Sequence, residues 1–168
     1  MTLQYISTLF DVILFFVPHT SLRMRPDRII VGEVRDAAAI DMLTALNTGH
    51  DGSLSTGHAN SPPDMLSRLE TMVLLGTEIP LLAVRKQIAS ALDIIIHLGR
   101  LRDKSRRVLE IVEVLEVSNQ DIEIQPLYVF REEGVDEDGR ILGGLVATSN
   151  TLKNRSKLER AGIMIEDS

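Results

Sequence analysis

The chain has 168 residues, 44% of them hydrophobic and 25% charged, a composition that suits one globular domain with a buried core. Its formal net charge of -6 gives no support to nucleic-acid binding. The absence of cysteine excludes a disulfide framework and a thiolate metal site, and it fits a reducing compartment.

Residues 1–20 form an apolar leader whose composition differs from that of the remaining chain, since three of the four phenylalanines lie between residues 10 and 16. Asp11 interrupts its apolar run and Pro18 ends it, so it falls short of the about 20 apolar residues that span a bilayer. No Lys or Arg precedes the run, as a secretory signal would require. We expect a buried strand or a short core helix, with an evolutionary history separate from that of the remaining chain.

The next elements alternate between strands and helices. Residues 28–34 predict a buried strand because they carry an uninterrupted β-branched run. Residues 37–47 predict a helix with Asp36 as its N-cap. Residues 53–58 predict a second short strand, and Ser61 followed by two prolines predicts the start of another helix.

The alternation continues with a predicted helix over residues 80–92 and a third apolar strand over residues 93–98. Strands that alternate with helices favour an α/β architecture with a largely parallel sheet. The fold class that we predict is therefore α/β.

The pattern changes after residue 105. Residues 106–117 alternate apolar and glutamate side chains, which predicts a long antiparallel strand with one solvent-facing side, and residues 122–130 predict its hairpin partner. Residues 131–144 are rich in charge and glycine and predict a loop or a mobile hairpin tip. Residues 151–161 predict a short terminal helix.

Two residues stand where open α/β sheets place ligands, just past the carboxyl ends of the predicted parallel strands. Glu33 either orients an attacking water and holds Mg²⁺ through water, or merely ends a strand. Gly32 leaves room for a phosphate or a metal to approach the backbone. His58 either donates a hydrogen bond to a terminal phosphate or is an ordinary surface histidine. Adjacent parallel strands would bring Glu33 and His58 to one crevice.

Residues 21 to about 165 resemble the C-terminal part of the CpaF/TadA-type ATPases, which belong to the superfamily that powers type II and type IV secretion and pilus assembly. Residues 22–35 resemble the Walker B segment of that family, and residues 49–61 resemble its His box. Further similar segments follow in the same order, at residues 67–72, 85–91, 100–103 and 106–108.

The resemblance implies a partial RecA-like P-loop NTPase core, its C-terminal half, followed by an antiparallel hairpin. On this basis residues 21–130 are expected to be the C-terminal half of the ATPase domain, and residues 131–168 a loop and a terminal helix. The implied function is that of an ATP-hydrolysing motor subunit in a type II or type IV secretion system or a tight-adherence pilus system.

The resemblance also assigns roles to individual residues. Glu33 would be the Walker B glutamate, which supports Mg²⁺ and water activation. His50 and His58 would be the His-box histidines, which couple nucleotide state to motion. Arg35 and Arg102 would make charge contacts within or between subunits, or else form ordinary surface ion pairs.

The implied cofactors are Mg²⁺ and ATP, with Glu33 reaching the metal through water and Gly32 close to the nucleotide. The implied partners are a homo-hexamer or full-length motor subunits, together with inner-membrane secretion or pilus platform proteins. No nucleic-acid partner is implied. The expected location is the cytoplasmic face of the inner membrane.

The 168 residues also depart from the family pattern. They contain no G-x-x-x-x-G-K-[ST] sequence, which supplies the phosphate-binding backbone and lysine of P-loop ATPases. Gly57 replaces the bulkier apolar residue that is usual before the second histidine, which predicts a looser strand. We therefore expect a truncated motor subunit that is inactive alone. The alternative is a non-catalytic fragment that docks on a full-length motor ring.

Overall fold

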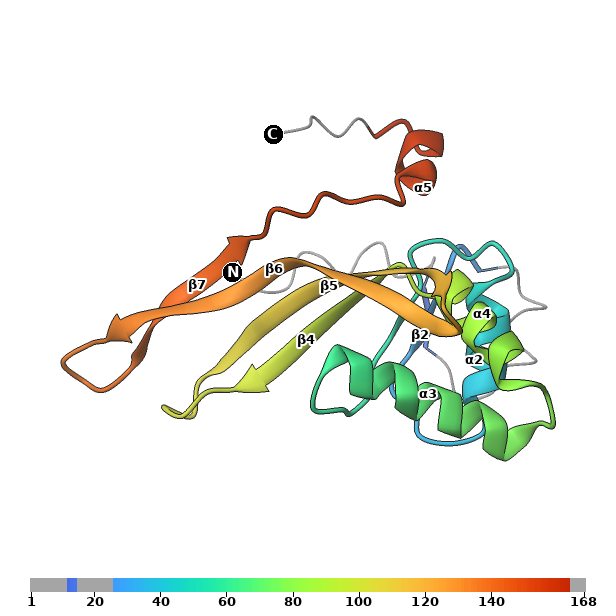
Figure 1. Ribbon diagram of the computed structural model, residues 1–168, viewed down its shortest axis with the longest axis horizontal. Coiled ribbons are helices and arrows are strands. Elements are labelled where there is room, and N and C mark those ends of the chain that lie inside the picture. The colour runs from blue at the N-terminus through green and yellow to red at the C-terminus, as the bar shows by residue number, and fades with distance from the viewer. Residues whose placement is uncertain (1–11, 15–25, 164–168) are drawn as a thin grey trace. The chain divides into compact units, whose positions relative to one another are not determined.

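The computed structural model describes the backbone of residues 12–14 and the whole of residues 26–163 (Figure 1). The chain divides into two compact units, with the boundary between Ala91 and Leu92. This differs from the expected boundary at residue 130, which lies inside a long strand of the second unit. The strands described after Ala91 pair with one another in a sheet of their own, and this pairing makes the second unit compact.

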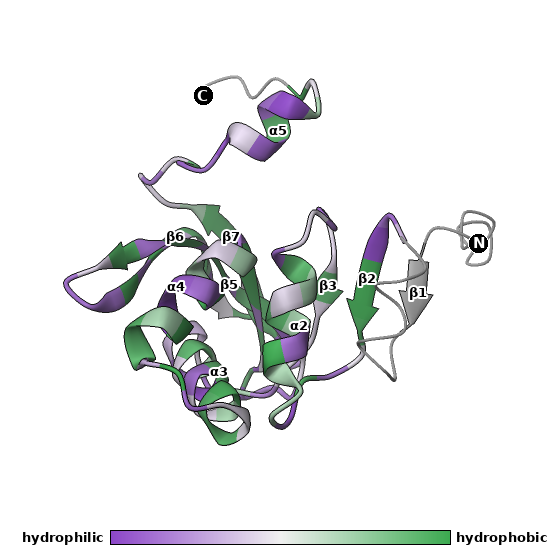
Figure 2. Cartoon of the chain, turned by 90° about the vertical axis from the view of Figure 1, so that its right-hand side faces the viewer, coloured by the Kyte–Doolittle hydropathy of each residue, from purple (hydrophilic) through white to green (hydrophobic). Residues whose placement is uncertain are grey.

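The first unit contains a parallel sheet of three strands in the order β1 (Val12–Leu14), β2 (Arg28–Val31) and β3 (Leu54–Ser55) (Figure 2). Strand β1 lies in the apolar leader, where a strand was one of the two expectations. The rest of the leader and the beginning of the Walker B-like segment lie outside the described residues. The parallel pairing of β2 with β3 agrees with the prediction, although β3 is shorter than the expected 53–58.

Three helices accompany this sheet: α2 (Ala39–Leu46), α3 (Pro62–Gly76) and α4 (Leu81–Ala91). Helix α3 begins as predicted, because the Ser61 hydroxyl accepts the Asp64 N–H at 3.2 Å. Helix α2 begins later than predicted. The Asp36 carboxylate accepts the Ala38 N–H at 2.9 Å, and this turn precedes the helix instead of capping it.

Apolar side chains at helical spacing make the core of the first unit. Helices α3 and α4 each bury side chains at helical spacing, and both helices pack against α2, which in turn contacts β2. Full burial of each large apolar side chain contributes roughly 1.5–3 kcal/mol. The core side chains that are least exposed are Ile29, Leu43, Leu69, Val73, Val84 and Ile88.

The second unit is an antiparallel sheet with the order β4 (Ile94–Arg100), β5 (Arg106–Ser118), β6 (Asp121–Val135) and β7 (Ile141–Ala147). A short helix, α5 (Ser156–Arg160), follows. The predicted hairpin of β5 with β6 is confirmed. Of the two alternatives for residues 131–144, the structure has the hairpin, because β6 and β7 pair up to Val135 and Ile141 and only residues 136–140 form the turn between them.

Strand β4 corrects the prediction of a third strand in a parallel sheet, because it pairs antiparallel with β5. Its apolar run has the appearance of a strand that is buried on both faces, yet its side chains alternate between exposed and half-buried. The connection from Arg100 to Arg106 is too short for the crossover that parallel neighbours require. The short connection, rather than the apolar composition, sets the strand direction.

Candidate functional site

The segments that follow β2 and β3 stay paired beyond the ends of both strands. The Thr56 N–H donates to the Val31 carbonyl at 3.3 Å, and the Val34 N–H donates to the Thr56 carbonyl at 2.9 Å. The Thr56 hydroxyl also donates to the Gly32 carbonyl. These bonds hold residues 32–34 beside residue 56, so the side chains just past the two strands emerge at one edge of the sheet.

Glu33 and His58 meet at this edge, as the parallel pairing predicts. The Glu33 Oε1 atom lies 3.2 Å from His58 Nε2. Its other carboxylate oxygen accepts a hydrogen bond from the Arg35 guanidinium. The Glu33 side chain is 21% exposed, whereas His58 is 80% exposed. The carboxylate is therefore held from two sides, while the histidine ring remains open to a ligand or to water.

The electrostatics of the edge favour an ionised Glu33. The hydrogen bond from Arg35 is the main reason that the pKa of Glu33 lies below its usual range, and the positive charges of Arg35 and Arg68 lower it further. Partial desolvation opposes the shift but does not cancel it. Glu33 at neutral pH is consequently an acceptor that can orient water or a hydrated cation.

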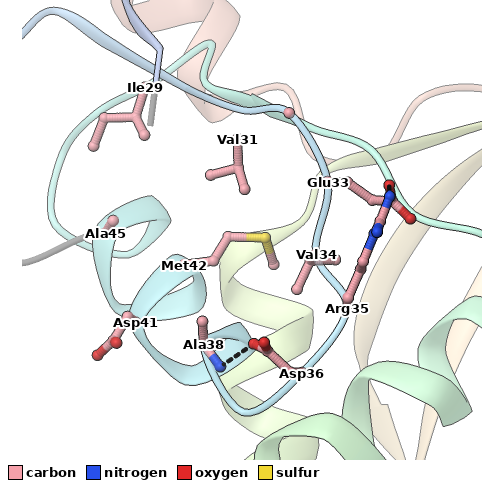
Figure 3. A pocket seen from close by; sticks show the side chains of 11 residues that line it. Ile29, Val31, Glu33, Val34, Arg35, Asp36, Ala38, Asp41, Met42 and Ala45 are labelled. Carbon is pink, nitrogen blue, oxygen red and sulfur yellow. Dashed lines mark hydrogen bonds and ion pairs between the residues drawn. The ribbon is translucent and has the colours of Figure 1, made fainter. Parts of the chain in front are cut away.

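A pocket of about 560 Å³ lies between β2 and α2, with Glu33 and Arg35 among the residues that line it (Figure 3). Apolar side chains provide much of the remaining wall, including those of Val31 and Met42. No atom beyond Gly32 and its chain neighbours lies within 4 Å of the place where a Cβ atom would stand on Gly32. The full lining comprises Ile29, Val31, Gly32, Glu33, Val34, Arg35, Asp36, Ala38, Asp41, Met42 and Ala45.

His50 occupies a different place. Its Nδ1 atom lies 3.2 Å from the Ala45 carbonyl and 3.3 Å from the Thr48 hydroxyl, at the C-terminal end of α2. The His50 carbonyl accepts the Ser53 N–H ahead of β3, so this residue precedes the strand that His58 follows. The two histidines of the His box therefore stand at opposite ends of β3. The structure brings His58, but not His50, to Glu33.

The two candidate arginines make ion pairs within the chain. Arg35 pairs with Glu33, and Arg102 forms a two-pronged pair with the Glu132 carboxylate in the second unit. Both guanidinium side chains remain largely exposed. These contacts agree with the surface ion-pair alternative for both residues, and Arg35 additionally lowers the pKa of Glu33.

Two features of the edge were not predicted. The Thr56 hydroxyl fixes the Gly32 carbonyl, and no sequence pattern singles out that threonine. Gly57 was expected to loosen its strand, but a Cβ atom there would stand 2.6 Å from Cε of Met65 on α3. The missing side chain at position 57 instead lets α3 pack closely against the segment that carries His58.

The side chains near Glu33 that could bind a metal ion can be compared with the ligands that Mg²⁺ requires. Among residues 26–163, no group of three or more histidine and carboxylate side chains is arranged to hold a metal ion. Mg²⁺ usually keeps several waters and uses one or two carboxylates together with substrate phosphates. A single ionised carboxylate such as Glu33 fits that manner of binding and does not fit an all-protein cage.

A family model described as "Type II/IV secretion system protein" matches residues 17–160. The chain belongs to this family. In the described part of the chain, no helix is long and apolar enough to cross a membrane.

Named relatives agree with the family. A putative conjugal transfer protein of Mycobacterium tuberculosis is 39% identical over 127 residues, covering 75% of this chain and 35% of the relative. VirB11 of Agrobacterium fabrum is 42% identical over 79 residues, covering 45% of this chain and 23% of the relative. The crystal structure of the VirB11 ATPase from the Brucella suis type IV secretion system, in complex with sulphate, aligns with a TM-score of 0.53 at 29% identity. That alignment covers 56% of this chain and 31% of the other.

The matches thus cover about a quarter to a third of the length of these relatives. The fold that it shares with the VirB11 ATPase is mixed α/β.

Proposed function

We propose that this chain carries the water-handling half of an ATP-hydrolysing site in a secretion motor, built on a partial RecA-like core. The observation that carries the proposal is the meeting of an ionised Glu33 with His58 past the ends of two parallel strands. Family membership supports the choice of ATP, since a similar solved structure is described as an ATPase.

Each residue has a role in the proposed hydrolysis that follows from its chemistry. Glu33 accepts hydrogen bonds, so it orients the attacking water and holds the hydration shell of Mg²⁺. When bound, Mg²⁺ supplies positive charge that offsets the charge developing on the transferred phosphoryl group. His58 is open to solvent and donates a hydrogen bond to a terminal phosphate, which makes it sensitive to whether that phosphate is present.

Arg35 lowers the pKa of Glu33 and limits where its carboxylate points. A bound hydrated metal ion would share the Glu33 carboxylate with the Arg35 guanidinium. His50 stands at the other end of β3, so any influence on the nucleotide passes through the backbone of that strand. The 168 residues hold no P-loop motif, so the groups that cradle the triphosphate have to come from outside this sequence.

The finer proposals concern the assembly. We place the chain with the CpaF/TadA-type motors of type II and type IV secretion or tight-adherence pili. Its partners in this proposal are identical or full-length motor subunits in a hexamer, and platform proteins at the cytoplasmic face of the inner membrane. The Walker B-like and His-box-like segments support this placement.

The proposal is tested in a chimera in which this chain replaces the matching 127 residues of the Mycobacterium tuberculosis relative, with ATP turnover as the measurement. Glu33→Gln is expected to lower kcat roughly 100-fold and to change the KM for ATP little, because it removes a water-orienting group. His58→Ala is expected to lower kcat as well.

Arg102→Gln is the matched control, since this residue lies in the second unit and pairs with Glu132. Turnover within about threefold of the parent chimera is expected for it. Unchanged turnover in the Glu33→Gln chimera, with normal circular dichroism, would show that Glu33 does not handle the water. If the parent chimera is inactive, calorimetry of ATP binding with and without Mg²⁺ compares the same variants.

A further inference from the structure

Arg68 on helix α3 is an unpaired cation near the edge where Glu33 and His58 meet, which we name the strand-end edge. Within the described part of the chain, its exposed side chain forms no hydrogen bond or ion pair. Asp64 stands one turn earlier on α3 at a spacing that suits an ion pair, yet the two side chains form none. Solvated arginines are ordinary on helices, so the position of Arg68 decides what it can do.

The packing of α3 places Arg68 beside the strand-end edge. In the first turn of the helix, Cε of Met65 lies 2.6 Å from the place where a Cβ atom would stand on Gly57, the residue before His58. Cγ1 of Val34 lies 3.6 Å from the same place, so this turn meets both segments of the edge. Arg68 comes three residues after Met65 and shares nearly the same face of α3. Long helical side chains lean toward the N-terminus of their helix, which for Arg68 is the direction of the edge.

The charge of Arg68 reaches Glu33 although the two side chains are not in contact. The positive charge of Arg68 lowers the pKa of Glu33, by less than the charges of Arg35 and His58 do. Both carboxylate oxygens are already engaged, one by the Arg35 guanidinium and the other by the His58 ring (Figure 3). Arg68 thus stands in electrostatic range of the carboxylate while its own N–H donors remain available to a ligand.

An ionised Glu33 creates a need for a cation at this edge. If Glu33 orients the attacking water, the terminal phosphate has to lie close to a carboxylate of the same charge, and the two repel each other. Arg35 is bonded to Glu33, and His58 carries a positive charge only when it is protonated. Arg68 has a permanent charge that no acid within the described residues pairs with, so it can offset the repulsion.

We propose that Arg68 binds the terminal phosphate of the nucleotide at the site that Glu33 serves. The inference rests on the proposed function, since that function supplies the phosphate. A guanidinium presents its N–H groups in a planar fork that matches two oxygens of one phosphate. Arg68 thereby favours nucleotides that carry the terminal phosphate, and it leaves the orientation of water to Glu33.

The first test titrates the whole chain with inorganic pyrophosphate at constant ionic strength and follows the Nε–Hε NMR signal of Arg68. We expect a saturable shift of this signal. The Arg102 signal is the internal reference, because its guanidinium is paired with Glu132 in the other unit. An Arg68 signal that stays in place overturns the proposal. A shift of Arg102 with the same dissociation constant overturns it too, since any exposed arginine would then bind the anion.

The second test compares ATP with ADP in the chimera of this chain and the Mycobacterium tuberculosis relative. Arg68→Gln is expected to raise the dissociation constant for ATP about tenfold and that for ADP less than about threefold, because ADP lacks the terminal phosphate. Arg68→Lys is expected to recover part of the loss, since lysine keeps the charge without the fork. Arg102→Gln is the matched control and is expected to leave both constants unchanged.

The outcomes separate the role of Arg68 from that of Glu33. Equal losses of ATP and ADP affinity in the Arg68→Gln chimera would show a structural role and overturn the proposal, as would an unchanged affinity for ATP with normal circular dichroism. If Glu33→Gln leaves turnover unchanged while Arg68→Gln selectively weakens ATP binding, the proposed role of Glu33 fails and the phosphate contact of Arg68 stands. If the chimera binds neither nucleotide, the pyrophosphate titration of the chain decides.

Discussion

At the scale of single residues, the Glu33 carboxylate determines what the strand ends can do. It is shared between His58 at 3.2 Å and the Arg35 guanidinium. The hydrogen bond from the arginine is the largest cause of the lowered pKa of Glu33. An ionised carboxylate next to an exposed imidazole pairs a hydrogen-bond acceptor with a potential donor, as the hydrolysis of a phosphoanhydride requires.

Arg35→Gln is expected to raise the pKa of Glu33 toward its ordinary range, because the variant removes the hydrogen bond that lowers it most. Titration of the side-chain carboxyl ¹³C signal of Glu33 by NMR measures the change. Arg68→Gln is the matched control, since that charge contributes least among the groups that act on Glu33, and a smaller rise is expected. Equal rises in both variants would contradict the assignment to Arg35.

Asp103 plays a comparable part in the second unit. Hydrogen bonds from Ile141 N and from the hydroxyl and N–H of Ser105 lower its pKa from 3.8 to about 2. A lowered carboxyl pKa stabilises the folded state above pH 3.8, and this stabilisation disappears as the pH falls toward 2. The hydrogen bonds are thus strongest where the carboxylate is ionised.

Asp103→Asn is therefore expected to lower the melting temperature at pH 6 and to have a smaller effect at pH 2. Thermal melts followed by circular dichroism at the two pH values give the difference. Asp138→Asn, in the turn between β6 and β7, is expected to leave the melting temperature at pH 6 unchanged, because its carboxylate accepts no hydrogen bond within the described residues. If Asp103→Asn lowers the melting temperature as much at pH 2 as at pH 6, ionisation of Asp103 does not account for its effect.

At the scale of elements, strand β5 buries a glutamate that its sequence pattern predicts to face solvent. Glu113 is 1% exposed. Its carboxylate accepts from Gln125 Nε2 at 2.6 Å, from Lys153 N at 3.0 Å and from Asn154 N at 2.7 Å. These hydrogen bonds hold the segment before α5 against β5, and three donors satisfy the buried carboxyl oxygens.

Glu113→Ala is expected to free the segment before α5 and to lower the free energy of unfolding by about 3 kcal/mol, because buried donors lose their acceptor. Hydrogen exchange at the amides of Lys153 and Asn154 measures the local release. The matched control is Glu116→Ala, which removes an exposed glutamate of the same strand. Unchanged exchange at the two amides would show that other contacts hold the segment.

At the scale of the whole molecule, each of the two units has a buried set of its own. In the first unit, Leu43, Val73, Val84 and Ile88 are almost fully buried among α2, α3 and α4. In the second, Val112 and Val114 are buried on the central strand β5. Separate cores imply that damage to one unit can be observed apart from the other.

Leu43→Ala is expected to cost about 3 kcal/mol, since it leaves a cavity at a fully buried position of the first unit. Hydrogen exchange should quicken at the amides of α2, α3 and α4, with the β5 and β6 amides as the internal reference. Leu75→Ala on α3 is the control, because that leucine is 75% exposed. Equal quickening in both units would show that they unfold as one.

Much of the local structure could be predicted because it depends on neighbours in sequence. Ser61 and its prolines start α3, and the alternation over residues 106–117 produces β5. The pairing of two parallel strands was enough to predict that Glu33 and His58 meet. The direction of β4, the place of His50 and the burial of Glu113 were not predictable in this way, since each depends on a partner distant in sequence or on the topology of the sheet.

The sequence by itself determined the family, the order of the elements and the two residues that meet past the strands. These features depend on apolar periodicity, caps and motifs, which are formed by residues close together in the sequence. Only the tertiary structure decided which carboxylates are shared, buried or exposed. It showed Arg35 paired with Glu33, Glu113 buried and bonded to the segment before α5, and Arg102 paired with Glu132. The physical reason is that desolvation and pairing of a charge depend on groups that the fold brings together from distant parts of the chain.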